Sequence, residues 1–402
     1  MELELSAKER AFRDEVRSFI DTTLPADVRA AMVGGRPLSK LQIVEWQRAL
    51  NRRGWAVPHW PVEYGGTDWS AVEEYLFQDE MQQAPAPQPL PFNVDMVGPV
   101  IARFGSDAQR RRFLSRAANL DDWWCQGFSE PGAGSDLASL RTTARADGDH
   151  YVVNGHKIWT TLAQHADWIF CLVRTDPSAK KQLGISFLLI DMKSPGVTVR
   201  PIITIGGEHE VNEVLLADVR VPRENLVGEE NKGWDYAKYL LGRERTGIAR
   251  IGASKERLRR LRALAAATRL GDAALLDDPG FRERLLAVEL ELKALEITTL
   301  RILTAARGRD GSKPDPASSI LKLKGTELQQ AITELFMELG GPYVLPFEPW
   351  SRSAGEPHAA GGAVDDWVAC VAPTYFNWRK VSIYGGSNEV QRNIIAKAIL
   401  GL

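Results

Sequence analysis

The hydrophobic pattern of this 402-residue chain changes its period twice, and this change constrains the fold more than any other feature. Residues 6–120 carry apolar side chains at helical spacing, and Phe12 and Val16, for example, share one face. Residues 122–229 instead carry short β-rich runs separated by Gly, Asn and Pro. Helical spacing returns after Gly233. The sequence therefore predicts a chain ordered α, then β, then α.

We expect three domains in an α+β multidomain chain. They are an N-terminal α-helical domain at 1–121, a middle β domain at 122–232 and a C-terminal α-helical bundle at 233–402. In the middle stretch, apolar runs such as 168–173 and 185–190 alternate with turn residues, with no long helical pattern between them. This sequence pattern is typical of an antiparallel sandwich or barrel.

The last domain is predicted to be a four-helix bundle. Long helical patterns joined by short links favour antiparallel packing, and they cover residues 234–268, 281–307, 313–339 and 388–400. Residues 342–373 contain many glycines and alanines and no periodicity, so we expect a long loop there. Such a loop is either a lid or a simple surface insertion.

Composition excludes several classes of protein. A formal net charge of −2 gives no basic surface for nucleic acid. The three cysteines lie far apart in no metal-ligand spacing, which fits a reducing cytoplasm and no metal site. The first residues show no charged segment followed by an apolar run, and no stretch of about 18 apolar residues exists. We therefore expect a cytoplasmic protein without membrane insertion.

Three motifs carry candidate chemistry. The first, residues 125–136, is a Gly/Ser-rich turn whose small residues let backbone approach a phosphate or a ring closely. The second, residues 154–161, begins with the hairpin signal Asn-Gly and places Trp159 and Thr161 two apart, on one side of a strand. An indole beside a hydroxyl suits a flat heteroaromatic ring. The third, residues 384–395, is a glycine turn running into a helix N-terminus, where amide N–H groups point at an anion or carbonyl.

Each motif taken alone has a structural explanation. A Gly/Ser turn is usually only a turn, and a tryptophan on a strand is usually a core residue. The three motifs together, in this order and at these separations, resemble the acyl-CoA dehydrogenase family over nearly the whole chain. The runs 123–136 and 161–168 look most similar to a bacterial subgroup that includes the large subunit of pimeloyl-CoA dehydrogenase.

The resemblance implies a noncovalently bound FAD and an acyl-CoA substrate. It places Phe128 and Ser129 at the edge of the isoalloxazine ring, and Gly134 and Ser135 by the diphosphate and the substrate entrance. It also implies that Trp159 packs on the ring and that Thr161 hydrogen-bonds near its N5. The remaining positions that it implies are Gly340, Gly341, Ser387 and Glu389 for the cofactor, and Ser135, Arg245 and Tyr384 for the substrate.

The catalytic base is displaced from the position that many family members use. There a glutamate follows the tyrosine of the third motif, but this chain has Gly385, which cannot accept a proton. A minority branch carries the glutamate on the first long helix of the C-terminal domain, and Glu244 aligns with it. The resemblance therefore assigns the base to Glu244 and gives Gly385 the backbone N–H that polarises the thioester carbonyl. A solvated Glu244 paired with a neighbouring arginine is the alternative.

One departure from the family concerns assembly. Homotetrameric relatives carry an arginine-aromatic motif that reaches a neighbour's FAD, and here Arg269 is present without the aromatic residue. The Gly340-Gly341 turn, a second contact of that kind, is kept. We expect a heterotetramer with a related small subunit, against a homotetramer.

The implied activity is conversion of an acyl-CoA to the trans-2-enoyl-CoA, with electrons passed to an electron-transfer flavoprotein. An acyl-CoA oxidase or a flavin monooxygenase on the same fold is an alternative, because fold does not fix function. A non-catalytic partner subunit is another.

Overall fold

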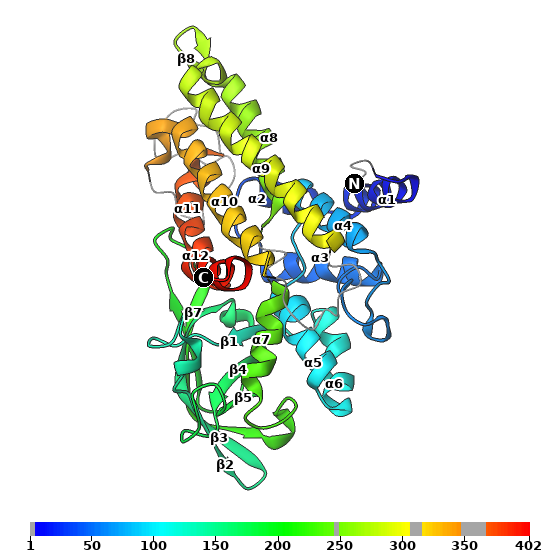
Figure 1. The fold of residues 1–402 in the computed structure, drawn as a ribbon, viewed down its shortest axis with the longest axis vertical. Helices are drawn as coiled ribbons and strands as arrows, with labels where there is room; N and C mark the ends of the chain where they lie inside the picture. The colour runs from blue at the N-terminus through cyan, green and yellow to red at the C-terminus, as the bar shows by residue number, and fades with distance from the viewer. Residues whose placement is uncertain (1–4, 245–248, 306–315, 347–366) are drawn as a thin grey trace.

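The computed structural model describes residues 5–244, 249–305, 316–346 and 367–402. Its first part is helical, as the periodicity predicts; in Figure 1 its cyan helices lie beside the green sheet, and its N-terminal blue helix lies beside the yellow helices. The bounds of its elements are α1 (Ala7–Thr23), α2 (Ala26–Val33), α3 (Lys40–Arg52), a 3₁₀ turn (Val62–Tyr64), α4 (Ala71–Gln83), a π-helical segment η2 (Phe92–Val97), α5 (Gly98–Phe104) and α6 (Asp107–Ala118).

Four of these helices begin with the same local device. Ser6, Ser39, Ser70 and Ser106 are each followed three residues later by Glu or Gln, and both hydrogen bonds of a capping box form at each helix start. A capping box satisfies two backbone donors that a helix start leaves unpaired. The starts of α1, α3, α4 and α6 are therefore fixed by local sequence.

The middle part is a seven-stranded sheet in the order β1-β4-β2-β3-β7-β6, with β5 paired to β4. Most neighbouring strands are antiparallel. Strand β4 is the exception, because it pairs in parallel with β1 and, through one residue pair, with β2. The predicted antiparallel β domain is therefore found, with parallel pairing only at β4. The bounds are β1 (Trp124–Gly127), β2 (Thr143–Asp147), β3 (His150–Thr161), β4 (Trp168–Arg174), β5 (Ile185–Asp191), β6 (Val197–Ile202) and β7 (Val211–Pro222).

The last part is again helical, with one break that the periodicity did not predict. The expected helix at 234–268 is two helices, and Arg250, just before the second, has left-handed backbone geometry with φ 46°. The bounds are α7 (Gly233–Glu244), α8 (Ile251–Ala267), a hairpin of β8 (Arg269–Leu270) and β9 (Ala273–Ala274), α9 (Pro279–Ala305), α10 (Ser318–Gly340), α11 (Val371–Asn377), a 3₁₀ segment η9 (Trp378–Ser382), α12 (Asn388–Ile395) and a π-helical turn (Ala396–Leu400).

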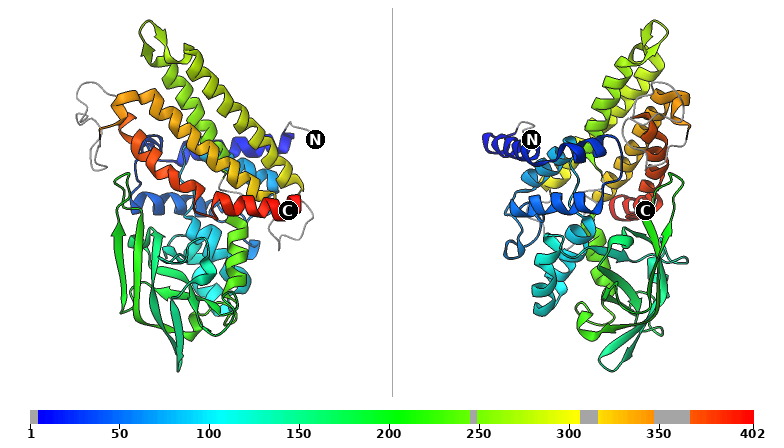
Figure 2. Two further views of the ribbon diagram at one scale, coloured as in Figure 1. Left: turned by 60° about the vertical axis from the view of Figure 1, so that its left-hand side comes forward. Right: turned by 180° about the vertical axis from the view of Figure 1, so that it is seen from behind.

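Helix α7 packs outside the bundle that follows it. Its Tyr236, Ala237 and Leu240 belong to the apolar core of the N-terminal helices and one sheet face. The later helices α8 to α11 share a separate core. Figures 1 and 2 show α7 between α5 and the sheet, with α8 to α10 leading away from it. The end of α7 therefore lies where the three parts of the chain meet.

The expected loop at 342–373 is partly helical. A 3₁₀ turn covers Gly341–Val344, another covers Val368–Cys370, and α11 starts at Val371. Val344 and Val368 are buried in the core of the bundle, which explains their helical structure. Residues 347–366, on which the prediction of a lid rests, lie outside the described residues.

Candidate functional site

A buried ion pair fastens the first motif to the second. The Lys157 ammonium is fully buried and donates to Glu130 Oε1 at 2.8 Å, to the Leu172 carbonyl at 2.8 Å and to the Phe128 carbonyl at 3.2 Å. Burial alone would raise the pKa of Glu130, but Lys157 and the surrounding donors outweigh it and hold that pKa below its ordinary value. Each of the three N–H groups of the ammonium therefore has an acceptor. Because two of these acceptors belong to Phe128 and Glu130, the ion pair sets the position of the loop that starts at Phe128.

Two backbone contacts complete this attachment. The Ile158 N–H donates to the Ser129 carbonyl at 2.9 Å. Glu130 accepts the Arg141 and Thr142 N–H groups at 2.6 and 2.9 Å. Hydrogen bonds to a charged acceptor are stronger than hydrogen bonds to a neutral one. The first two motifs are thus held together by the fold itself.

The second motif contains a bulge rather than a regular strand. Lys157 pairs with Val214 and Thr160 with Asn212, so β3 has one more residue than β7 between these pairs. The extra residue shifts the alternation, and Trp159 adopts left-handed geometry with φ 59°. Regular period-two spacing, our reason for placing Trp159 and Thr161 together, is therefore not the geometry found. The indole is nevertheless 58% exposed.

A buried amide holds this bulge in place. The Asn212 side chain is fully buried and donates to the Thr160 carbonyl at 3.1 Å and to Gln164 Oε1 at 2.7 Å. Its Oδ1 contacts His209 Nε2 at 2.7 Å. A strained non-glycine residue persists only where its surroundings determine it, and such residues concentrate at functional sites. Trp159 is therefore a binding-site candidate on structural grounds.

The first motif leaves open space on its outer side. A Cβ added to Gly132 or to Gly134 would meet nothing within 4 Å, and Ser135 is exposed. Phe128 differs, because its ring is buried edge-on against Phe170 and Phe187. Contact between Phe128 and a ligand can therefore come only from its backbone.

The third motif forms a left-handed glycine turn before a capped helix. Gly385 and Gly386 have φ of 64° and 80°, and Gln391 Nε2 donates to both of their carbonyls at 3.1 and 3.2 Å. The Ser387 hydroxyl caps α12 by accepting the Val390 N–H at 3.4 Å. Glu389 lies in the first turn of that helix and is exposed. The turn presents its backbone beside Tyr384, whose side chain is 41% exposed.

A bridge across the domain boundary joins the second motif to the segment before the third. The Leu162 N–H donates to the Glu210 carbonyl at 2.8 Å, directly after Thr161. The Glu210 carboxylate binds Lys380 Nζ and accepts from Asn377 Nδ2 at 3.4 Å. The end of β3 is therefore tied to η9, which runs into Ile383 and the third motif.

The predicted base and its neighbour are only partly described. Glu244 ends α7, which places its backbone where the three parts of the chain meet, but its side chain lies outside the described residues. Arg245 lies wholly outside them. Their roles stay predictions.

The positions expected to face a neighbouring subunit lie far from the sheet. Arg269 is in the hairpin at the tip of α8 and α9, at the opposite end of the molecule from β2 and β3 (Figures 1 and 2). Gly341 has φ 53° and open space around it, whereas a Cβ on Gly340 would lie 2.2 Å from a Val344 methyl. Gly340 therefore has a packing role in its own chain.

A cluster of cationic residues near Tyr384 was missed by the sequence analysis. The Arg257 guanidinium stacks on Trp378, 3.7 Å from the ring centroid, and Arg250 lies over the same ring at 5.7 Å. Desolvation, followed by repulsion from Arg250 and Arg260, lowers the pKa of Arg257 to about 9. The positive potential here favours an anionic ligand group. Helical periodicity gives no sign of it, because Trp378 comes from a distant segment.

These residues fit a planar ring cofactor with a phosphate tail. An exposed indole on a fixed bulge offers a stacking surface, and Thr161 follows it. Glycines with open space and the exposed Ser135 suit close approach of phosphate. Within the described residues, no group of His, Cys, Asp and Glu is arranged to hold a metal ion. No helix of the described part is long and apolar enough to cross a membrane.

Comparison with known proteins gives consistent matches along the whole chain. Models of the N-terminal, middle and C-terminal domains of acyl-CoA dehydrogenases match residues 6–121, 125–219 and 231–400. Acyl-CoA dehydrogenase IpdE1 of Mycobacterium tuberculosis is 36% identical over 396 residues, which is 97% of each chain.

Two solved structures of complexes are also similar. The ChsE4–ChsE5 complex from Mycobacterium tuberculosis aligns with a TM-score of 0.83 and 34% identity, covering 100% of this chain and 99% of that one. The steroid ACAD Tcur3481–Tcur3483 aligns with a TM-score of 0.84 and 30% identity over the same shares.

The three-domain fold and the ring-binding site define a flavoprotein oxidoreductase. The chain belongs to the acyl-CoA dehydrogenase family, as the resemblance predicted, and FAD is the cofactor of this family. The narrower likeness to a pimeloyl-CoA dehydrogenase subunit is not tested by these matches.

Proposed function

We propose that the protein oxidises an acyl-CoA thioester between its α and β carbons and releases the trans-2-enoyl-CoA. The observation that carries this proposal is the exposed, left-handed Trp159 on a bulge braced by Lys157 and Asn212. FAD supplies the hydride acceptor when bound, which is the chemistry that side chains cannot perform. The protein has to place the substrate, remove a proton and exclude water.

Glu244 is the base in this proposal. Gly385 has no side chain to accept a proton, and in this proposal the N–H of its left-handed backbone polarises the thioester carbonyl. Polarisation makes the α proton acidic enough for a carboxylate to remove. Glu244 at the end of α7 lies on the element between α5 and the sheet, which is consistent with that role.

The cofactor contacts follow from the same geometry. Trp159 and Thr161 would hold the ring, and the Phe128 backbone and Ser129 would meet its edge. Gly134 and Ser135 would approach phosphate, with Ser387 and Glu389 at the start of α12 and Gly340 and Gly341 toward a neighbouring subunit. Tyr384, Arg245 and Ser135 would contact the CoA thioester.

The acyl group is proposed to be steroid-derived. This rests on the similar steroid ACAD, because the described side chains do not outline an acyl slot by themselves. Pimeloyl-CoA is the competing substrate, from the sequence resemblance.

A related second chain is the proposed partner. Both similar solved structures are complexes of two different chains. Arg269 lacks the expected aromatic neighbour and lies in the hairpin at the α8–α9 tip, far from the sheet of its own chain (Figure 1), which supports a contact with another subunit. Light scattering with flavin absorbance on the chain expressed alone tests this. A stable homotetramer fully loaded with FAD contradicts it.

An anaerobic substrate panel tests the activity. The yellow holoprotein, with its partner if needed, is mixed with steroid side-chain, pimeloyl, aromatic and branched acyl-CoAs, and flavin bleaching is recorded. We expect rapid bleaching by the steroid class. A second run in air distinguishes a dehydrogenase that passes electrons to an electron-transfer flavoprotein from an oxidase. Bleaching by none of the thioesters would contradict the proposal.

A further inference from the structure

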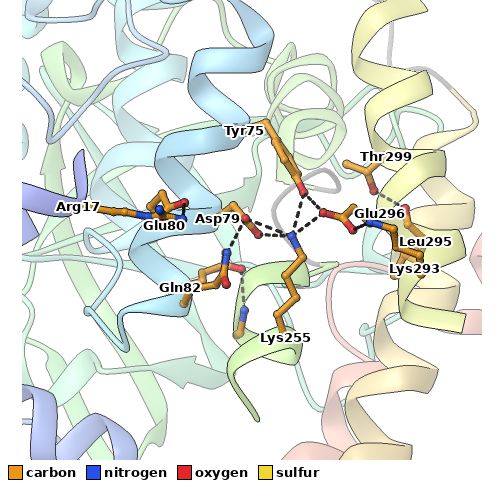
Figure 3. Close-up of polar contacts among 12 residues, drawn as sticks. Arg17, Tyr75, Asp79, Glu80, Gln82, Lys255, Lys293, Leu295, Glu296 and Thr299 are labelled. Atoms are coloured by element: carbon orange, nitrogen blue, oxygen red, sulfur yellow. Dashed lines mark hydrogen bonds and ion pairs between the residues drawn. The ribbon is translucent and has the colours of Figure 1, made fainter. Parts of the chain in front are cut away.

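A largely buried polar cluster joins α4 to the start of α8, a few residues after the proposed base. The Lys255 ammonium donates to both Asp79 carboxylate oxygens at 3.1 Å and to Glu296 Oε1 at 2.6 Å. Tyr75 donates its hydroxyl to the same Glu296 oxygen at 3.3 Å. Figure 3 shows Lys255 pointing between the two carboxylates, which come from helices on opposite sides of α8. Three helices, α4, α8 and α9, therefore meet at this ammonium.

The electrostatics of the cluster favour a fixed arrangement. Desolvation alone would lower the pKa of Lys255, but Asp79 and Glu296 outweigh it and raise that pKa. Desolvation raises the pKa of Asp79 despite the attraction of Lys255. Removing one partner of a buried ion pair leaves an uncompensated charge, so the arrangement resists separation. The position of Lys255 is thus tied to both α4 and α9.

Close backbone approaches fix the same turn of α8. A Cβ added to Gly252 would lie 2.6 Å from the Asp79 carbonyl oxygen, and the Ala253 N–H donates to Gln82 Oε1 at 3.3 Å. On the other side, a Cβ on Gly325 of α10 would lie 2.6 Å from the Ala249 Cα. Two helices therefore contact residues 249–253 at distances that only glycine allows.

We propose that these contacts form a clamp, made of Asp79, Gln82, Lys255, Glu296 and Gly325, that positions the end of α7 and thereby Glu244. The clamp rests on the proposed function, in which Glu244 is the base. Only residues 245–248 separate the last residue of α7 from Ala249, so the length of this short link limits how far the end of α7 can lie from the clamped residue Ala249. Lys255 and Gly325 are then positioning residues: they hold the chain that carries the base and do not touch the substrate.

The clamp differs from an ordinary interdomain ion pair in what it predicts. Misplacement of reacting groups by about 1 Å can cost about 10²-fold in rate. A clamp variant should therefore slow proton removal while FAD binding, which depends on the sheet, is unchanged. A simple ion pair would lower thermal stability and leave the rate intact.

The test compares Lys255→Met, Lys255→Arg and Gly325→Ala with the control Lys293→Met. Lys293 also pairs with Glu296, at 2.9 Å, but it is mostly exposed and lies on α9 itself, one turn from Glu296. Gly325→Ala covers the case in which Lys255→Met fails to fold, because it displaces Ala249 without removing a charge. The holoprotein with its partner is used throughout.

Two readouts are measured on each variant. Hydrogen exchange of peptides covering residues 240–254 reports local opening. A 3-thia-acyl-CoA, which can lose its α proton but has no β hydrogen to give, reports proton removal through the long-wavelength absorbance of its enolate beside the flavin. The rate of flavin reduction by the best acyl-CoA completes the comparison.

In Lys255→Met and Gly325→Ala we expect faster hydrogen exchange in residues 240–254 and weaker enolate absorbance. Flavin reduction should be roughly 10–10²-fold slower, and the FAD content should be unchanged. Lys255→Arg should recover part of the rate and Lys293→Met should match wild type. Unchanged exchange, or faster exchange with a wild-type rate and enolate band, overturns the clamp. A wild-type protein whose flavin no acyl-CoA reduces overturns the proposed function and the positioning role together.

Discussion

The two walls of the candidate site are built on different principles. The wall on the sheet is braced within the chain, because Lys157, Glu130 and Asn212 are buried and bonded directly to the backbone that carries the residues proposed to bind the ring. The helical wall consists of the glycine turn at Gly385 and the end of α7, while the hairpin that carries Arg269 lies at the far end of the molecule from β2 and β3. In the proposed function, the sheet supplies a preformed cofactor surface, whereas the helical wall supplies the chemistry.

Replacing the proposed base on the helical wall should have the largest effect. Glu244→Gln keeps the side-chain volume but removes the proton acceptor, so flavin reduction should slow by about 10²–10⁴-fold. The variant should stay yellow and still bind acyl-CoA, because most affinity comes from contacts remote from the α carbon. Stopped-flow absorbance measures the rate, and a near-normal rate would place the base elsewhere.

Moving the carboxylate to the other family position gives a companion test. Glu244→Gly combined with Gly385→Glu should restore part of the lost rate. The recovery should be incomplete, because φ of 64° at residue 385 costs a non-glycine residue about 1–2 kcal/mol. Activity of the double variant below that of Glu244→Gly alone would count against the shared geometry.

Breaking the ion pair of the sheet wall should instead destabilise the protein. Lys157→Met leaves the buried Glu130 carboxylate without its cation, which costs about 3–5 kcal/mol. FAD content should fall with it, because the loop from Phe128 loses its attachment. The double variant Lys157→Met, Glu130→Gln should recover part of the stability in chemical denaturation. Equal stability of Lys157→Met and wild type would show that the brace is dispensable.

Removing the exposed indole should separate binding from stability. Trp159→Gly relieves left-handed strain of about 1–2 kcal/mol, and the extra freedom of glycine in the unfolded chain offsets about 0.5–1 kcal/mol. The unfolding free energy of the FAD-free chain should thus change by only about 1 kcal/mol. FAD affinity should fall about 3–10-fold through lost stacking. Fluorescence titration measures it, and undiminished affinity would remove Trp159 from the site.

The stability of the folded protein should depend weakly on pH through Glu208, which lies at the boundary between the two walls. Desolvation, with repulsion from Glu210, raises the pKa of Glu208 to about 7. The folded state then binds a proton that the unfolded chain has released, so this contribution to stability is present below about pH 4.5 and is lost as the pH rises through about 7. The effect should be about 1 kcal/mol or less, because Glu208 is partly exposed.

Glu208→Gln should remove that pH dependence. The exposed Glu63→Gln is the matched control and should retain it. Thermal unfolding midpoints between pH 5 and 8 measure the effect. If the midpoint changed with pH to the same extent in both variants, Glu208 would be excluded as the group responsible.

The sequence predicted the three-part fold because its periodicity reports local structure. Helices α1, α3 and α4 and strands β4 and β5 follow directly from apolar spacing. The break before α8 did not, because Arg250 has left-handed geometry imposed by packing against α4 and α10. The parallel pairing of β1 with β4 also escaped prediction, since register between distant segments is a tertiary property.

The motifs of the site could be predicted from the sequence, but the buried residues that hold those motifs in place could not. Trp159 and Gly385 stand in motifs that the resemblance identifies. Lys157 lies inside the second motif, yet its buried partner Glu130 is set by folding, and helical or strand periodicity does not reveal a buried charge. Asn212 and Lys255 likewise act through partners far away in sequence. Buried polar residues in this chain were therefore the least predictable part of the site.

A single anaerobic turnover tests the central claim most directly. The holoprotein is mixed with one equivalent of the acyl-CoA that bleaches it best, and the CoA product is analysed by mass. The account predicts a product lighter by two hydrogen atoms and one reduced flavin for each product formed. An unchanged thioester beside an oxidised flavin, or a product that has gained oxygen when air is admitted, would contradict it.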